Sequence, residues 1–209
     1  MKTNLMKESF NGFRTLTPED DMFNDSRVIW FTETVTPKTC EQLAIQIMAL
    51  EKAAPGRTIT LMINSPGGEV LSGLAVYDLL RSISSPVRTV VFGIAASMGS
   101  LLLLAGDERI VTPHSRVLIH DPHYASDMSG LKPLDLKENL EQLLETREVL
   151  AKIIAERTGN SLETVYAKTK DDTYMSAEES LSFGLATKIA SFIPSGINNE
   201  LTKGGNARE

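Results

Sequence analysis

Between residues 27 and 105, strand-like segments alternate with helix-like segments, and this alternation limits the folds that the chain can adopt. Short runs rich in β-branched residues predict strands at 27–31, 58–63 and 88–92. The segments that follow them predict helices at 37–53, 69–83 and 101–105, the first with apolar residues spaced by three and four. This order is typical of right-handed βαβ units around a largely parallel sheet. The sequence therefore predicts an α/β fold.

The second half of the chain is dominated by one long predicted helix. Strands are expected at 109–112 and 116–120, and a last one at 185–190. Residues 133–158 predict a single helix closed by Gly159. Its charged surface carries one apolar stripe, formed by Leu136, Leu140, Leu143, Leu144, Leu150, Ile153 and Ile154. Such a helix often packs against another subunit, and a long core helix is the alternative.

Length and composition indicate one domain in a reducing compartment. The 209 residues suit a single core, expected over 27–193, between a flexible arm at 1–26 and a disordered tail at 194–209. The single cysteine, Cys40, excludes an internal disulfide framework. Because the first twelve residues do not resemble a signal peptide, a cytoplasmic protein is expected.

Charge and hydropathy narrow the range of partners. A formal net charge of -6 without a basic cluster argues against nucleic acid. The longest apolar stretch, 93–106, is interrupted by small polar residues and is too short to cross a bilayer, so no membrane contact is expected. The chain contains no G-x-x-x-x-G-K-[ST] phosphate loop, so it is not expected to hydrolyse ATP by that route, and no cofactor or metal is assigned to it.

A candidate nucleophile lies where the strand at 88–92 runs into small residues and then a helix. Ser97 opens that helix. The first N–H groups of a helix lack intrahelical partners, so the amide of Met98 is suited to receive an oxyanion formed beside Ser97. The alternative is that Ser97 is an ordinary N-cap.

The chain offers few candidates for a base and an acid. Of its three histidines, His120 is the one at the carboxyl end of a predicted strand, where active sites of parallel sheets gather, whereas His114 and His123 lie in a turn and a loop. The carboxylate that would orient the imidazole is sought at Asp171 or Asp172, both in a predicted loop. Asp121 is expected to project to the opposite face of the segment that carries His120, which makes it a poor orienter.

A fourth element is the turn Ser65-Pro66-Gly67-Gly68. Two glycines allow positive φ and present bare N–H groups, so an amide of this turn could face the amide of Met98 across the site. An ordinary strand-to-helix turn is the alternative. Each of the four signals is weak alone, and their combination is specific.

This combination resembles the ClpP family, the proteolytic subunits of the caseinolytic protease. The matching segments follow the family's order and are 63–68 (INSPGG), 95–99 (AASMG), 115–122 (SRVLIHDP), 172–179 (DTYMSAEE) and 183–185 (FGL). The resemblance covers about residues 27–190. It implies Ser97 as nucleophile, His120 as base and Asp172 as orienting acid, with the amides of Gly68 and Met98 as the oxyanion hole.

The resemblance also implies an architecture and partners. The family fold is the ClpP/crotonase spiral of βαβ units, with a protruding handle helix that falls here at about 133–158. Its members form heptameric rings, stacked as tetradecamers, and degrade unfolded polypeptides fed by a hexameric AAA+ unfoldase that supplies the ATP hydrolysis. The segment before Arg27 differs from the family's usual N-terminal sequence, so weak docking of the unfoldase, or a mixed ring with a companion paralogue, is expected.

Two other functions remain open at this stage. A crotonase-type enzyme acting on acyl-CoA shares the fold and an oxyanion hole of two amides, but it does not need a serine, a histidine and an aspartate together. A structural or regulatory ring subunit with a misaligned triad is the second alternative. A lipase or esterase is disfavoured, because residues 95–99 lack the first glycine of the G-x-S-x-G elbow.

Overall fold

The computed structural model describes residues 5–9, 12–124 and 130–191. The strands are β1 (Leu5–Ser9), β2 (Gly12–Leu16), β3 (Val28–Phe31), β4 (Ile59–Ser65), β5 (Val87–Ala96), β6 (Glu108–Val111), β7 (Arg116–Ile119), β8 (Thr173–Met175) and β9 (Lys188–Ile189). The helices are α1 (Pro18–Ser26), α2 (Pro37–Ala53), α3 (Val70–Ser82), α4 (Met98–Leu104), α5 (Pro133–Thr158), α6 (Leu162–Thr169) and α7 (Ala177–Phe183).

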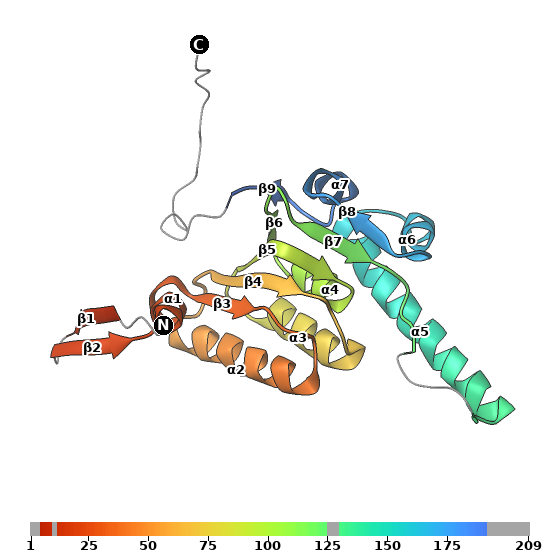
Figure 1. The fold of residues 1–209 in the computed structure, drawn as a ribbon, viewed down its shortest axis with the longest axis horizontal. Helices are drawn as coiled ribbons and strands as arrows, with labels where there is room; N and C mark the ends of the chain where they lie inside the picture. The colour runs from red at the N-terminus through yellow and green to blue at the C-terminus, as the bar shows by residue number, and fades with distance from the viewer. Residues whose placement is uncertain (1–4, 10–11, 125–129, 192–209) are drawn as a thin grey trace, which may run out of the picture.

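A parallel sheet in the order β3-β4-β5-β6-β9 forms the centre of the molecule. Figure 1 shows α2, α3 and α4 on one face of this sheet, where the large apolar core lies. The opposite face carries a smaller apolar cluster around Val28, Met62 and Val90, against which Met22 of α1 packs. The predicted α/β fold of βαβ units is confirmed.

Strand β5 bends halfway along its length and serves two neighbours. Its first half pairs with β6 and its last residues pair with β7, which in turn pairs antiparallel with β8. The bend falls at Gly93, whose φ is 111°. Two side chains hold the freed backbone: Ser115 Oγ accepts from the Gly93 amide at 2.8 Å, and Asn64 Oδ1 accepts from the Ile94 amide at 3.1 Å. β7 and β8 therefore belong to the same sheet but branch from β5, off the strand order given above.

Helix α5 has two different halves. Its C-terminal part packs on the core through Leu150, Ala151 and Ile154, which are buried. Its N-terminal part projects beyond the rest of the fold (Figure 1), where Leu140 is 54% exposed and Leu144 52%. The predicted helix has the observed bounds. A core helix describes its C-terminal half, whereas packing of the exposed N-terminal half against another subunit stays a prediction. Among the described residues, no helix is both long and apolar enough to cross a membrane.

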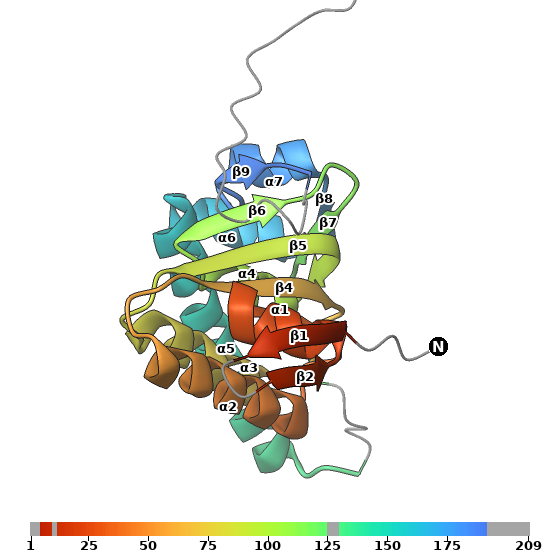
Figure 2. The ribbon, with the colours of Figure 1, turned by 90° about the vertical axis from the view of Figure 1, so that its left-hand side faces the viewer.

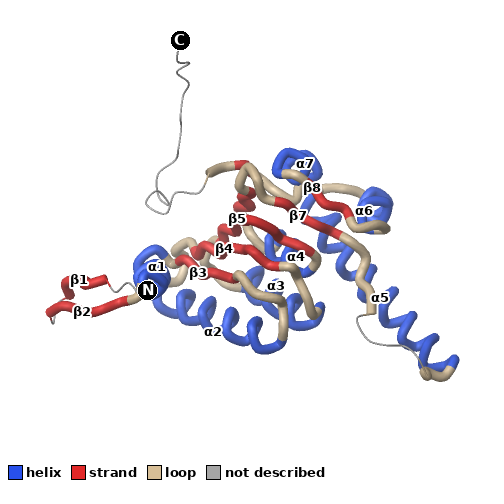
Figure 3. Tube along the Cα trace, in the orientation of Figure 1, coloured by secondary structure: helices blue, strands red, loops and turns tan. Residues whose placement is uncertain are grey.

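The predicted N-terminal arm contains regular structure that the sequence analysis did not expect. β1 and β2 form an antiparallel hairpin, and α1 follows (Figure 2). Thr17 begins α1 with a capping box. Figure 3 shows this hairpin at the opposite end of the molecule from the tip of α5. The boundaries and flexibility of the arm stay predictions. The predicted tail at 194–209 lies outside the described residues.

Candidate active site

The ends of three strands bring the predicted site residues together. β5 ends one residue before Ser97 and β7 ends one residue before His120, and the two strands are parallel. β8 begins one residue after Asp172 and runs antiparallel to β7, with Ile119 opposite Thr173. The next positions in that register are His120 and Asp172. Asp172 lies in a loop, as predicted, and the three-residue strand β8 begins directly after it.

Ser97 has a backbone conformation that distinguishes it from a capping serine. Its φ is 53° and its ψ is -123°, and its side chain makes no cap hydrogen bond. By contrast, Ser176 at the start of α7 has extended backbone angles, and its hydroxyl accepts from the Glu179 amide. A positive φ in a non-glycine residue costs on the order of 1–3 kcal/mol and is often found at functional sites. The interpretation of Ser97 as an ordinary N-cap is therefore not supported.

The backbone around Gly68 leaves one amide for another acceptor. Val35 forms an isolated parallel bridge with Gly68, in which the Val35 N–H donates to Gly67 O at 2.8 Å and the Glu69 N–H donates to Val35 O at 2.9 Å. In a parallel bridge, the N–H of the central residue points away from the partner strand. The Gly68 amide is thus directed away from Val35, and its φ of 149° favours glycine.

The turn before α3 lies directly against the turn that carries Ser97. A Cβ atom added to Gly67 would lie 2.4 Å from Ala96 O, 2.7 Å from Ser97 Cβ and 2.9 Å from the Met98 amide nitrogen. The Met98 amide belongs to the first residue of α4 and so has no acceptor within the helix. Close approach of the two turns therefore brings both predicted oxyanion donors to the same side of the site.

His120 is paired with Asp172 through one ring nitrogen. Its Nδ1 lies 3.4 Å from Asp172 Oδ1, which leaves Nε2 on the other side of the ring. The His120 side chain is 14% exposed, whereas that of Asp172 is 69% exposed. Burial lowers the pKa of the imidazole below its usual value, and the Asp172 carboxylate partly opposes this shift. Near neutral pH the ring is therefore uncharged and able to accept a proton.

The other candidates for base and acid have different surroundings. The Asp121 carboxylate is bonded to Arg147 and Thr169 rather than to the imidazole. His123 is exposed, with its ring centroid 5.3 Å from that of His120. The pairing of His120 with Asp172 thus agrees with the arrangement expected from the sequence, whereas the catalytic roles stay predictions.

Ser97 and His120 line the same narrow cavity. Its volume is about 20 Å³, and its other lining residues are Val70, Met98, Ser100, Leu101, Ile119, Pro122, Leu150 and Ile154. The structure gives no hydrogen bond between Ser97 and His120 within the described residues. The cavity has an apolar wall, which suits the exclusion of water from a reacting carbonyl group.

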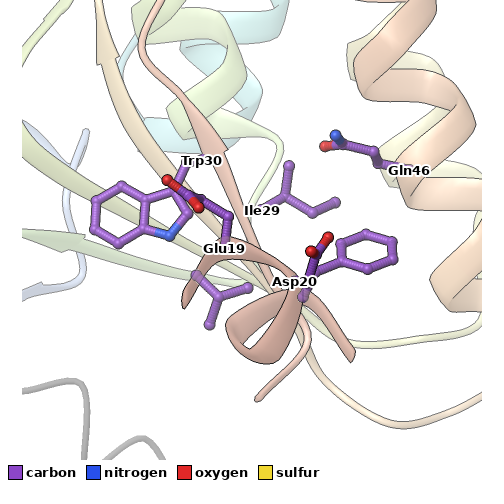
Figure 4. Close-up of a pocket in the computed structure, with 7 residues that line it drawn as sticks. Glu19, Asp20, Ile29, Trp30 and Gln46 are labelled. Carbon is purple, nitrogen blue, oxygen red and sulfur yellow. The ribbon is translucent and has the colours of Figure 1, made fainter. Parts of the chain in front are cut away.

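A larger cavity of about 360 Å³ lies elsewhere, between α1, β3 and α2 (Figure 4). Its lining residues are Glu19, Asp20, Phe23, Val28, Ile29, Trp30 and Gln46. This set includes two carboxylates but no serine, cysteine or histidine. The size of a cavity is therefore a poor guide in this protein, because the candidate nucleophile and base lie in the smaller one.

No metal site is evident in the part of the chain that the structure describes. No group of three or more His, Cys, Asp or Glu side chains within those ranges is placed to hold an ion. The expectation that the chain needs no cofactor stays a prediction.

Sequence reasoning missed the residues that shape the site from behind. Ser65 is fully buried; its hydroxyl donates to Glu33 O at 2.6 Å and accepts from the Gly67 amide at 3.2 Å. Asn64 and Ser115 hold the bend at Gly93. All three residues lie in the segments 63–68 and 115–122 that carry the family resemblance, which is the signal that could have found them, but the sequence does not specify their partners.

The fold and the site define an α/β protein with a serine, a histidine and a carboxylate at neighbouring strand ends. A family model described as Clp protease matches residues 15–192. Among curated relatives, the ATP-dependent Clp protease proteolytic subunit 1 of Chlamydia muridarum is 42% identical over 167 residues, covering 79% of this chain and 86% of the relative. The protein of the same name from Chlamydia trachomatis serovar D is 41% identical, and the match covers 79% of this chain and 86% of the relative. That from Protochlamydia amoebophila is 39% identical, and the match covers 79% of this chain and 81% of the relative. The chain belongs to the Clp protease family.

Proposed function

We propose that this protein is a serine endopeptidase that hydrolyses peptide bonds inside a closed oligomeric barrel. The observation that carries this proposal is the convergence at one sheet edge of Ser97, in its positive-φ turn, with the His120–Asp172 pair. Membership of the Clp protease family supports the same conclusion.

The geometry supports acyl transfer in two steps. As Ser97 Oγ attacks the scissile carbonyl carbon, Nε2 of His120 takes its proton, and the carboxylate of Asp172 stabilises the resulting imidazolium through Nδ1. The amides of Gly68 and Met98 donate to the developing oxyanion. The imidazolium then gives its proton to the leaving amine, and water hydrolyses the acyl-enzyme by the same route.

Assembly and partners are part of the proposal. The exposed N-terminal half of α5 supplies apolar surface for a second ring, so heptameric rings stacked as a tetradecamer would bury it. The relatives are named as subunits of an ATP-dependent protease, which supports an AAA+ unfoldase as the partner that feeds unfolded polypeptides to this chain. We place the assembly in the cytoplasm.

A structural or regulatory ring subunit with a misaligned triad is the second candidate. The observations that favour it are the missing hydrogen bond between Ser97 and His120 within the described residues and the 69% exposure of the Asp172 side chain. Apo sites often have loose catalytic geometry that tightens with substrate, which is why peptidase activity remains the preferred function.

Labelling with a fluorophosphonate, followed by intact mass and peptide mapping, distinguishes the two candidates. We expect one label per chain, at Ser97, and no peptide turnover by Ser97→Ala. Ser182→Ala is the matched control, because Ser182 is exposed on α7 and does not line the cavity that Ser97 and His120 share. An unlabelled Ser97 in a correctly assembled protein would support the structural subunit, and labelling at another serine would contradict the assignment of the nucleophile.

The chamber can be tested with two substrates. Because a closed barrel admits only extended chains, we expect cleavage of a fluorogenic dipeptide without ATP, and degradation of a stable folded protein only with an unfoldase and ATP. Mass photometry should show a ring assembly. Activity from a monomer, or degradation of the folded protein without ATP, would contradict the proposed chamber, whereas strong stimulation by the unfoldase alone would contradict the need for a companion subunit.

A further inference from the structure

A cluster of short polar contacts joins the segment after His120 to the end of α6. The Asp121 amide donates to Thr169 O at 2.7 Å, and the Thr169 hydroxyl donates to Asp121 Oδ1 at 2.6 Å. Thr169 is 3% exposed and the Asp121 side chain is 30% exposed, so the pair is buried on the Thr169 side. Two residues that are distant in the sequence are thus fastened by one backbone and one side-chain hydrogen bond.

The long helix α5 joins the same cluster. Arg147 Nε donates to the second carboxylate oxygen of Asp121 at 2.7 Å, and its guanidinium lies 4.1 Å from the centre of the Tyr166 ring on α6. A charge-assisted hydrogen bond and a cation–π contact therefore hold Arg147 in one place. Below, the contacts of Asp121 with Thr169 and Arg147 are called the Asp121 clasp.

The position of the clasp in the chain gives it influence over the proposed active site. Asp121 directly follows His120, and Thr169 lies three residues before Asp172. The clasp therefore joins the segment that carries the base to the segment that carries the acid. Its residues lie one position from His120 and three positions from Asp172. The 3.4 Å contact between His120 and Asp172 is longer than either hydrogen bond that joins Asp121 to Thr169.

We propose that Asp121 is a positioning residue that sets the alignment of His120 with Asp172 through Thr169 and Arg147. The contact between base and acid is solvent-exposed on the Asp172 side and is supported by a strand of only three residues, so it does not fix its own geometry. The Asp121 clasp has shorter contacts and a buried Thr169, so it fixes the alignment and makes it depend on how α5 packs. This inference rests on the proposed peptidase function and assigns Asp121 no contact with substrate.

The test removes one hydroxyl and measures acylation. Thr169→Val keeps the shape of the side chain and the backbone hydrogen bond but deletes the donor to Asp121. We expect the second-order rate constant for fluorophosphonate labelling of Ser97 to fall about tenfold, since small misplacements of catalytic groups cost rates of this order or more. Thr146→Val is the matched control: its hydroxyl bonds only to Gln142 O within α5, one residue from Arg147, and labelling should be unchanged.

A double-mutant cycle separates positioning from general loosening of the fold. If the clasp acts through the base–acid pair, Thr169→Val should have no further effect on labelling once Asp172→Asn has removed the acid. An additive tenfold loss in that background would overturn the proposal, as would an unchanged rate in Thr169→Val alone. Should Thr169→Val fail to fold, Arg147→Gln takes its place in the same cycle with the same expectations.

The outcomes also distinguish this inference from the proposed function. Absence of Ser97 labelling in the unaltered protein would remove the peptidase proposal, and the clasp with it. Normal labelling of the unaltered protein together with additive effects in the cycle would remove only the clasp.

Discussion

The two sides of the candidate site are held in place by different means. On the nucleophile side, Ser97 lies between β5 and α4, and all seven residues of α4 are buried. On the other side, Asp172 is 69% exposed directly before a three-residue strand, and its contact with His120 is 3.4 Å long. The nucleophile is fixed by packing, whereas the exposed acid depends on a short strand and on its polar contact with His120.

This difference predicts which substitutions each side of the site tolerates. A packed turn resists displacement but has no room for an added atom, because protein interiors are close-packed. A carboxylate near the surface accommodates neighbouring changes and still depends on its own charge and placement. The nucleophile side should therefore respond to volume, and the base–acid side to charge and hydrogen bonding.

The largest expected effect is on the acid side. Asp172→Asn should lower peptide turnover by a factor on the order of 10⁴, as loss of the orienting carboxylate does in serine protease triads. Asp171→Asn is the matched control and should change turnover little, because adjacent side chains of an extended segment point apart. Steady-state kinetics on a fluorogenic peptide measure both variants. The reverse ranking would assign the acid to Asp171.

A change of volume should disrupt the nucleophile side. Gly67→Ala places a Cβ atom 2.4 Å from Ala96 O, so the turns that carry the proposed oxyanion donors must separate. We expect kcat to fall roughly 10²–10³-fold, the usual cost of losing one such donor.

The control for this variant is Gly159→Ala. Gly159 also has a positive φ, of 77°, but its Cβ would meet no atom within 4 Å. Gly159→Ala should therefore lower the free energy of unfolding by about 1–2 kcal/mol through backbone strain alone, and kcat should be unchanged. Thermal unfolding and peptide kinetics on both variants make the comparison. Equal kcat in the two variants would show that the close approach at Gly67 has no role in turnover.

The smallest expected effect is a shift in the pH profile. His120 must be neutral to accept a proton, and burial lowers its pKa below 6.5 while Asp172 raises it. The acid limb of kcat/KM should thus have its midpoint below pH 6.5, and Asp172→Asn should move the midpoint to still lower pH. Profiles of kcat/KM against pH measure both midpoints. A midpoint that rises in Asp172→Asn would contradict the sign of the Asp172 contribution.

Much of the fold was predictable because its signals are local. The bounds of α5 and α2 follow from Pro133 and Pro37 at their first turns and from a left-handed Gly159 after α5. Other bounds depend on tertiary pairing. The strand predicted at 88–92 runs on to Ala96, because its last residues pair with β7.

The site was predictable only as a set of candidates. Motif and strand-end arguments selected Ser97 and His120, because a serine before a helix and a histidine at a strand end are visible in a few neighbouring residues. Ser97 differs from an ordinary cap by its positive φ, and a serine in the sequence gives no indication of that conformation.

By itself, the sequence determined the α/β order of elements, the long helix and the short list of groups able to do acid–base chemistry. Only the tertiary structure decided that β5 bends at Gly93 to pair with both β6 and β7, and that Asp172 meets His120 while Asp121 joins Arg147 and Thr169. The physical reason is range: backbone preferences and hydrophobic periodicity act over a few residues, whereas hydrogen bonds between distant segments depend on how whole elements pack.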